Sequence, residues 1–202
     1  MDNKKALGID LGTTFSSVCI VSGEDKEIIS DLLNDKYIPS IACINKSDNK
    51  FEFLVGKATK YIQTCNPQMS IYDSKRMLGR QFDDEHIQSM INKWPFKIER
   101  SDMNKILISI NQDGIEKKYE PYQISGEILK YLAEVGNYRR DENLYEPIRD
   151  VVITVPANFG EEQREETIKA AEYANLNVLK IINEPTAAGI AYSAYSVDTP
   201  KE

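Results

Sequence analysis

The 202-residue sequence is poor in the residues that build metal and redox centres. It contains one histidine, His86, and three cysteines, Cys19, Cys43 and Cys65, with no Cys-x-x-Cys spacing. A single histidine excludes multi-histidine metal sites, and an odd, scattered set of cysteines argues against a disulfide framework or a zinc knuckle. His86 lies in a polar stretch without a neighbouring nucleophile, so we expect a solvated surface residue. This cysteine usage is typical of a reducing compartment.

The sequence also lacks an excess of positive charge and any long apolar run. Its 25 Lys and Arg residues are outnumbered by 32 Asp and Glu residues, which gives a net charge of −7. A nucleic-acid-binding surface needs clustered basic residues, and a membrane-spanning helix needs about 20 apolar residues in a row. After Met1, residues 2–5 are polar or charged, and the short apolar segment that follows is interrupted by Asp10, unlike a signal peptide. We therefore expect no nucleic-acid partner, no membrane partner and a cytoplasmic location.

The order of the apolar patterns predicts an α/β protein. An antiparallel meander is expected over residues 7–11, 16–21 and 27–30. A more polar stretch follows, with helices expected over 56–62 and 83–91, and with strands 106–110 and 115–119 joined by an Asn-Gln-Asp-Gly turn.

From residue 121 onward the pattern alternates between helices and strands. Apolar residues recur at the spacing of one buried helix face at Ile124, Ile128, Leu129, Leu132 and Val135. The later elements are expected to be strand 151–155, helix 161–174, strand 178–182 and helix 185–195. Both strands are continuous apolar runs, which indicates a sheet covered by helices on both faces.

The first strand carries a candidate phosphate site. Leu7, Ile9 and Leu11 alternate with Gly8, Asp10 and Gly12, so one face has no bulk and a single carboxylate. Such a face allows a ligand to approach the backbone closely, and the amides of the following turn can surround an anion. A carboxylate beside a phosphate requires a cation between them, for which Mg²⁺ is suited. A tight hairpin stabilised by Asp10 explains the same residues equally well.

Further charged residues could complete this site. Glu184 follows strand 178–182 and precedes Pro185 at a helix start, which is the ligand-binding edge of an open α/β sheet. A helix-capping glutamate is the simpler interpretation, but two carboxylates at comparable strand ends favour a shared metal site. Lys75 could place its ammonium on a terminal phosphate, although its spacing fits a solvated basic turn better. Arg164 is typical of ordinary helix surface.

Five segments spread over nearly the whole chain are distinctive when taken together. They are Gly-Ile-Asp-Leu-Gly-Thr-Thr (8–14), Asp-Ser-Lys-Arg-Met-Leu-Gly-Arg (73–80), Trp-Pro-Phe (94–96), Val-Ile-Thr-Val-Pro-Ala (152–157) and Ile-Ile-Asn-Glu-Pro-Thr-Ala-Ala (181–188). In sequence, order and spacing these segments resemble motifs of the seventy-kilodalton heat-shock (DnaK-type) chaperones.

The resemblance implies an actin-like, ribonuclease H-like ATPase fold, of which this chain would be the first lobe with an inserted α+β subdomain. Residues 1–39 and 120–202 would form the inner subdomain and 40–119 the outer one. The second lobe, with its phosphate motif and adenosine contacts, and the substrate-binding domain would lie outside the chain. We therefore expect these residues alone to lack ATPase activity.

The resemblance also implies roles for individual residues. Gly12 and the amides of Thr13, Thr14 and Phe15 would hold the phosphates of ATP or ADP. The expected catalytic set consists of Lys75 beside the γ-phosphate, Thr13 supporting phosphate and water, and Asp10 and Glu184 binding Mg²⁺ through water. The positions that would relay nucleotide state to the substrate-binding domain are Pro156 and Arg164. The chain departs from the family at Phe15, usually Tyr, and at Asn158 and Gly160, so the relay could be altered.

The implied function of the parent protein is ATP-driven binding and release of unfolded client polypeptides, with J-domain cochaperones and nucleotide-exchange factors as partners. One alternative is a regulatory relative of the exchange-factor type that binds ATP with little hydrolysis. Another is a sugar kinase of the same fold, although no sugar-binding loop is recognisable. A filament-forming actin-like protein leaves the Lys75 and Trp-Pro-Phe segments unexplained.

Overall fold

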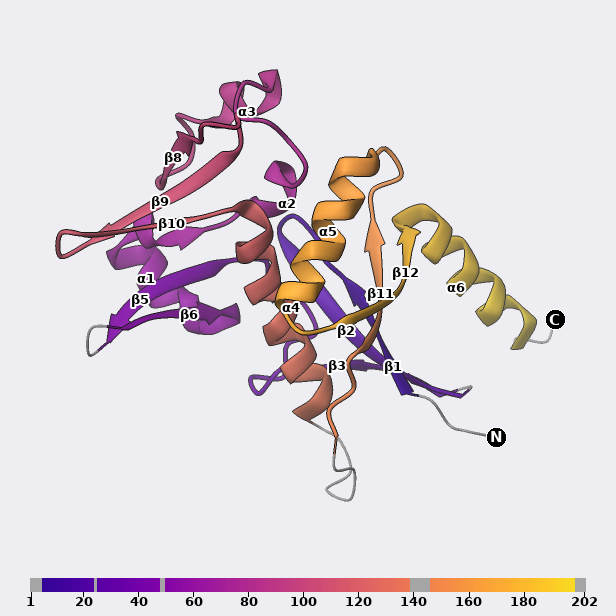
Figure 1. Cartoon of the computed structure of the whole chain (residues 1–202). Coiled ribbons are helices and arrows are strands. Elements are labelled where there is room, and N and C mark those ends of the chain that lie inside the picture. The colour runs from indigo at the N-terminus through magenta and orange to yellow at the C-terminus, as the bar shows by residue number, and fades with distance from the viewer. Residues whose placement is uncertain (1–4, 24, 48–49, 139–145, 199–202) are drawn as a thin grey trace.

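The centre of the molecule is a mixed β-sheet seen edge-on in Figure 1. The computed structural model describes residues 5–23, 25–47, 50–138 and 146–198. The sheet has the strand order β12-β11-β1-β2-β3, with β4 also paired to β2. Its strands are β1 (Lys5–Asp10), β2 (Phe15–Ser22), β3 (Asp25–Ile29), β4 (Ile38–Pro39), β11 (Asp150–Val155) and β12 (Asn177–Asn183). Strands β1, β11 and β12 run parallel, whereas β2 is antiparallel to β1, β3 and β4.

The chain between β4 and residue 120 forms two smaller antiparallel sheets. One has the order β6-β5-β7 and the other β10-β9-β8. Their strands are β5 (Ala42–Ser47), β6 (Lys50–Val55), β7 (Ser70–Ile71), β8 (Lys97–Arg100), β9 (Ile106–Gln112) and β10 (Ile115–Tyr119). The short helices of this region are α1 (Thr59–Cys65), α2 (Ser74–Met77) and α3 (Glu85–Met90), with 3₁₀ turns at Gly56–Ala58 and Pro67–Met69.

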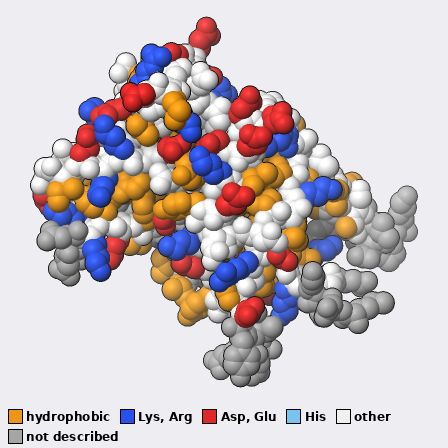
Figure 2. Space-filling view, in the orientation of Figure 1, with side chains coloured by type: hydrophobic (Ala, Val, Ile, Leu, Met, Phe, Trp, Pro, Cys, Tyr) orange, Lys and Arg blue, Asp and Glu red, His pale blue; other side chains and the backbone are white. Residues whose placement is uncertain are grey.

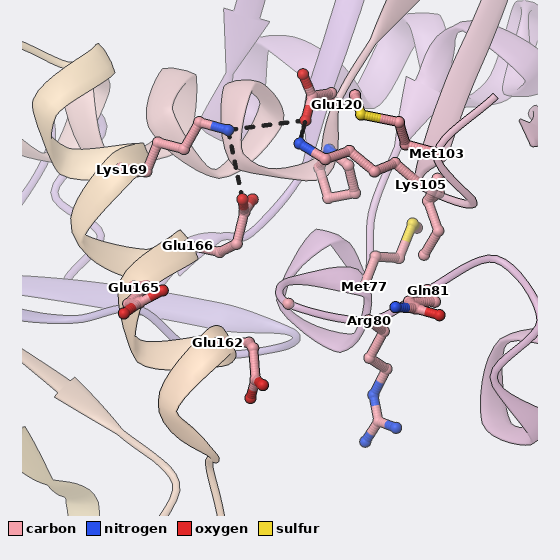
Figure 3. A pocket seen from close by; sticks show the side chains of 13 residues that line it. Met77, Arg80, Gln81, Met103, Lys105, Glu120, Glu162, Glu165, Glu166 and Lys169 are labelled. Atoms are coloured by element: carbon pink, nitrogen blue, oxygen red, sulfur yellow. Dashed lines mark hydrogen bonds and ion pairs between the residues drawn. The ribbon is translucent and has the colours of Figure 1, made fainter. Parts of the chain in front are cut away.

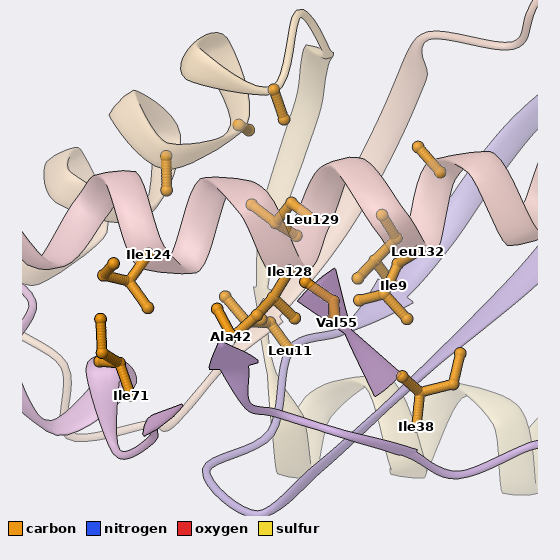
Figure 4. Packing of buried hydrophobic residues seen from close by; sticks show 14 of the residues in the cluster. Ile9, Leu11, Ile38, Ala42, Val55, Ile71, Ile124, Ile128, Leu129 and Leu132 are labelled. Atoms are coloured by element: carbon orange, nitrogen blue, oxygen red, sulfur yellow. The ribbon is translucent and has the colours of Figure 1, made fainter. Parts of the chain in front are cut away.

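Helix α4 (Pro121–Tyr138) lies between the central sheet and the smaller sheets. It contacts β1 and β2 on one side and β5, β6 and β9 on the other. All five apolar residues that predicted its buried face are buried. Figure 4 shows Ile128 and Leu132 of this helix beside Ile9 of β1 and Leu11, which follows that strand. The same hydrophobic cluster continues to Val55 in β6, so one core joins the parts of the chain.

Two further helices complete the lobe. Helix α5 (Glu161–Tyr173) packs along α4, and α6 (Glu184–Asp198) follows β12 and contacts β11 and β12. In Figure 1, α6 lies on the other side of the sheet from α4. Figure 2 shows acidic and basic side chains interspersed over the visible face. No helix within the described ranges is long and apolar enough to cross a membrane.

Most predicted elements are present with slightly shifted ends, but two expectations need correction and several elements were missed. The predicted helix 56–62 begins as a 3₁₀ turn, because Gly56 is left-handed at φ 74°, and its α-helical part is Thr59–Cys65. Strands β4 to β8 and the short helix α2 are not among the elements predicted from the sequence. Strand β12 is contacted by α5 and α6, but it is not the buried strand that was expected: it lies at the edge of the sheet, none of its residues is buried, and Leu179, at a shift in register, is 54% exposed.

Glycine allows the close contact of α4 with α5. A Cβ on Gly126 would lie 2.5 Å from the Tyr173 ring and 2.9 Å from the Ala170 carbonyl oxygen. We expect Gly126→Ala to lower the free energy of unfolding by about 1–3 kcal/mol, because overpacking outweighs the gain in helix propensity. Urea unfolding of the 202-residue chain measures this change.

The matched control is Gly189→Ala in α6, where a Cβ meets nothing within 4 Å. There we expect an unchanged or higher free energy of unfolding, by at most about 1 kcal/mol. Equal effects of the two substitutions would contradict the proposed packing constraint.

Candidate functional site

The carboxyl ends of three parallel strands bring distant charged residues to one edge of the sheet. Asp10, the last residue of β1, pairs in register with Thr154 of β11, which pairs with Ile182 of β12. Glu184 comes directly after β12, as the first residue of α6. Because β1 and β12 are two strand spacings apart, about 10 Å, the two carboxylates lie near the same edge with room between them.

Asp10 has a partner that the sequence did not reveal. Thr154 Oγ1 donates a hydrogen bond to Asp10 Oδ1 over 2.8 Å. Thr154 is β-branched and therefore stiff about its first side-chain torsion, so this bond limits how the exposed carboxylate of Asp10 can rotate. A threonine in an apolar strand does not by itself indicate a functional residue. Its role is recognised only when the register between β1 and β11 is known.

The turn after β1 is stabilised by hydrogen bonds to neighbouring residues, while two of its backbone amides remain available to a ligand. The Gly12 amide donates to Ser16 Oγ over 3.1 Å, and the Ser40 amide donates to the Thr14 carbonyl over 2.9 Å. A Cβ on Gly12 would lie 1.9 Å from the Phe15 carbonyl oxygen, so this turn requires glycine. Among the described residues, the amides of Thr13 and Thr14 have no backbone acceptor. Such free donors can bind an anion.

Lys75 is buried and directed to the same edge, so its interpretation as a solvated basic turn is wrong. Its side chain is 7% exposed, and its Nζ donates to Glu184 Oε1 over 2.6 Å. The Phe159 ring lies 5.9 Å from the same nitrogen. The ion pair joins residues 109 positions apart. The tertiary structure thus brings Lys75 to Glu184, a contact that spacing along the chain could not predict.

The short helix α2 that carries Lys75 is attached to α4 and α5. Ser125 Oγ of α4 donates to Ser74 Oγ over 2.9 Å, and both residues are buried. After the helix, Gly79 has φ 63°, and a Cβ there would lie 2.5 Å from the Gln163 amide nitrogen in α5. Sequence reasoning missed Ser125, because a serine on a buried helix face has no distinctive pattern.

Arg164 and Pro156 belong to a set of contacts beside Glu184. Arg164 Nη2 donates to Asn183 Oδ1 over 2.7 Å, and its Nε donates to the Phe159 carbonyl over 3.2 Å. The Phe159 amide donates to the Pro156 carbonyl over 3.1 Å. Arg164 is therefore not ordinary helix surface. Gly160, one of the departures, precedes α5 and donates its amide to the side chain of Gln163 over 3.0 Å.

A cavity of about 350 Å³ lies elsewhere, between α2, β9 and the α4–α5 pair (Figure 3). Its wall contains ion pairs of Lys169 with Glu120 and Glu166 at 3.7 and 3.4 Å. None of the expected site residues lines this cavity. The candidate site is thus the open sheet edge.

The chemistry of the sheet edge fits a phosphate together with a cation. Free amides and an ammonium group bind phosphate oxygens, and Mg²⁺ is commonly held by one or two carboxylates, water and substrate phosphates. Within the described ranges, no group of three or more His, Cys, Asp or Glu residues could hold a metal alone. Burial raises the pKa of the Cys19 thiol, beside Gly8, which disfavours the nucleophilic thiolate.

Comparisons with known proteins agree with this geometry. The family model described as "Hsp70 protein" matches residues 6–202. A ribosome-associated molecular chaperone of Eremothecium gossypii is 37% identical over 98% of this chain and 30% of its own length. The "Heat shock cognate HSP70 protein" of Trypanosoma brucei brucei is 38% identical over all of this chain and 29% of its own length. The chain thus spans about a third of these relatives, and it belongs to the Hsp70 family.

Proposed function

We propose that the chain is the first lobe of the nucleotide-binding domain of an ATP-hydrolysing chaperone. The observation that carries this proposal is the juxtaposition at one sheet edge of the open Thr13 and Thr14 amides, Asp10 and the Lys75–Glu184 pair. Phosphoryl transfer depends on positioning and electrostatic stabilisation rather than on a protein nucleophile. These residues supply both without a histidine or cysteine.

In this proposal each group has one task. Gly12 shapes the turn, and the amides of Thr13, Thr14 and Phe15 hold the phosphates of ATP or ADP. Asp10 and Glu184 hold Mg²⁺ through its waters, and Thr154 orients Asp10. When bound, Mg²⁺ would neutralise part of the negative charge of the phosphates. Thr13 supports the phosphate and the attacking water.

Lys75 would act on the terminal phosphate. Its ammonium pairs with Glu184, which is 40% exposed. A terminal phosphate bound at the carboxyl ends of the same strands would give the ammonium group a second anionic partner. Because Lys75 is buried by neighbouring residues rather than free in solvent, little reorganisation is needed to place its charge, which favours hydrolysis over binding alone.

The remaining assignments extend this proposal to the longer protein. Residues 1–39 and 120–202 would be the inner subdomain and 40–119 the outer one. Pro156 and Arg164, whose contacts reach Phe159 and Asn183, would relay nucleotide state to a substrate-binding domain. The partners of the longer protein would be unfolded client polypeptides, J-domain cochaperones and nucleotide-exchange factors, and its location would be the cytoplasm. The names of several relatives, which call them ribosome-associated chaperones, support a role with client polypeptides.

The proposal is tested by Lys75→Ala in the complete protein encoded by the gene. We expect hydrolysis to fall roughly 100- to 1,000-fold with little change in ATP affinity, because a preorganised charge acts mainly in the transition state. Single-turnover phosphate release and equilibrium ATP binding measure the two effects. Lys60→Ala removes an exposed lysine of α1 and serves as the control. A less than tenfold loss of hydrolysis with a collapse in affinity would make Lys75 a ground-state binder.

The metal assignment is tested by Asp10→Asn. We expect this substitution to weaken Mg²⁺-dependent ATP retention and hydrolysis while leaving the melting temperature nearly unchanged, because Asp10 is exposed. Titration of hydrolysis with Mg²⁺ measures the change. The control is Asp102→Asn at an exposed position. Wild-type Mg²⁺ dependence in Asp10→Asn would remove Asp10 from the site.

The division of the site is tested with the 202-residue chain by itself. Its proposed groups contact phosphate and metal, so a base would gain no buried contacts and the phosphates would stay hydrated. We expect weak binding of Mg-ATP and no hydrolysis above background, because catalysis here requires positioning and exclusion of water. Calorimetric titration and phosphate release measure both. Micromolar or tighter binding with sustained turnover would show that these residues form a complete site.

A further inference from the structure

The segment that presents Lys75 has an unusual backbone. Asp73 precedes the four-residue helix α2 and has φ 59° and ψ 16°, the left-handed conformation. Asp and Asn adopt this conformation more readily than other residues with a Cβ, but it still costs free energy and is kept when the surroundings stabilise it. A helix of four residues has too few hydrogen bonds to be stable by itself. The direction of the Lys75 side chain therefore depends on what fixes Asp73 and α2 from outside.

The carboxylate of Asp73 has such an external partner. Trp94 Nε1 donates to Asp73 Oδ2 over 3.1 Å from the turn between α3 and β8, 21 residues further along the chain. The other oxygen, Oδ1, accepts from Arg76 Nε at 3.3 Å. The Asp73 carbonyl accepts from the Arg76 amide at 2.8 Å, which closes the first turn. Of these contacts, the one with Trp94 comes from outside the local segment.

Trp94 is itself held in place. It is 5% exposed and stacks on Phe96 with ring centroids 5.8 Å apart and planes at 15°. Phe96 in turn meets Tyr72 edge-to-face, with centroids 5.6 Å apart. A buried indole N–H normally finds an acceptor, and Asp73 supplies it. The indole thus presents its donor from a fixed position.

We propose that Trp94 is a positioning residue for Lys75. Its hydrogen bond keeps Asp73 left-handed, and this conformation directs α2 so that the Lys75 ammonium reaches the sheet edge beside Glu184. The consequence for hydrolysis rests on the proposed function, whereas the effect on the position of Lys75 does not.

Three substitutions separate this role from simple packing. Trp94→Phe keeps a buried aromatic ring and removes the N–H donor. Asp73→Ala removes the acceptor and disfavours the left-handed backbone but leaves the aromatic cluster intact. Asp73→Asn gives up the exposed contact with Arg76 but keeps one acceptor oxygen for Trp94 and tolerates the left-handed conformation. We expect the first two to act alike and the third to resemble the wild type.

The first experiment measures how readily the Lys75 amine is acylated in the absence of added nucleotide. The complete protein is treated with an amine-acylating reagent, and the labelling rates are measured by mass spectrometry. Lys97, whose side chain is 68% exposed, is the internal reference. We expect Trp94→Phe and Asp73→Ala to raise the labelling rate of Lys75 by at least about threefold relative to Lys97, because the segment opens more often. Asp73→Asn should leave this ratio unchanged.

The second experiment measures hydrolysis in a double-mutant cycle. A displacement of about 1 Å can cost roughly 100-fold in rate, so we expect Trp94→Phe to lower kcat by at least about tenfold. The KM for ATP should change by less than about twofold, because Trp94 lies outside the phosphate turn. In a Lys75→Ala background, Trp94→Phe should have no further effect on kcat, since both act through one group.

Several outcomes would overturn the inference. Unchanged Lys75 labelling in both Trp94→Phe and Asp73→Ala would show that the hydrogen bond does not fix the lysine. A full additional loss of kcat in the Lys75→Ala background would show that Trp94 acts by another route. If Trp94→Phe does not fold, as judged by circular dichroism, Asp73→Ala decides both experiments. If Lys75→Ala hydrolyses ATP normally, the proposed function fails, while the labelling experiment still decides the position of Lys75.

Discussion

The parallel pairing of β1 with β11 is the constraint on which the candidate site depends. It places Asp10 opposite Thr154, 144 residues later, and lets the next parallel strand deliver Glu184 to the same edge. Parallel strands require crossover connections, and here α4 and α5 provide the covering layer on one face. The apolar residues of β1 are therefore committed to the core, and its other face is left for the carboxylate and glycines.

The site also depends on how the smaller sheets pack against α4. Lys75 comes from a segment far from the central sheet in sequence, and the buried Ser74–Ser125 hydrogen bond fixes that segment to α4. Gly79 allows the same segment to approach α5 closely. The ion pair with Glu184 thus joins the chain between β4 and residue 120 to the ends of the central strands. Small movements of that part of the chain would change the position of the Lys75 charge directly.

The sequence was sufficient for the elements with strong periodicity and for the carboxylates at strand ends. The apolar spacing of α4 and the alternation in β1 depend on local geometry, so they can be read from neighbouring residues. The bond between Thr154 and Asp10 could not be predicted, because it requires the register of two strands 144 residues apart. The burial of Lys75 and the exposure of Leu179 likewise depend on which elements lie beside them. Family resemblance named Lys75 and Arg164, whereas spacing alone favoured surface positions for both.

The aromatic cluster next to the lysine segment has an optical consequence. Trp94 is the single tryptophan of these 202 residues. Its indole is stacked on Phe96 and hydrogen-bonded to Asp73, two positions before Lys75. Indole fluorescence depends on the polarity and hydrogen bonding around the ring, so the tryptophan emission of this chain comes from one known place in the fold. Trp94 is therefore an intrinsic spectroscopic probe of the chain between β4 and residue 120, free of signals from other tryptophans within this chain.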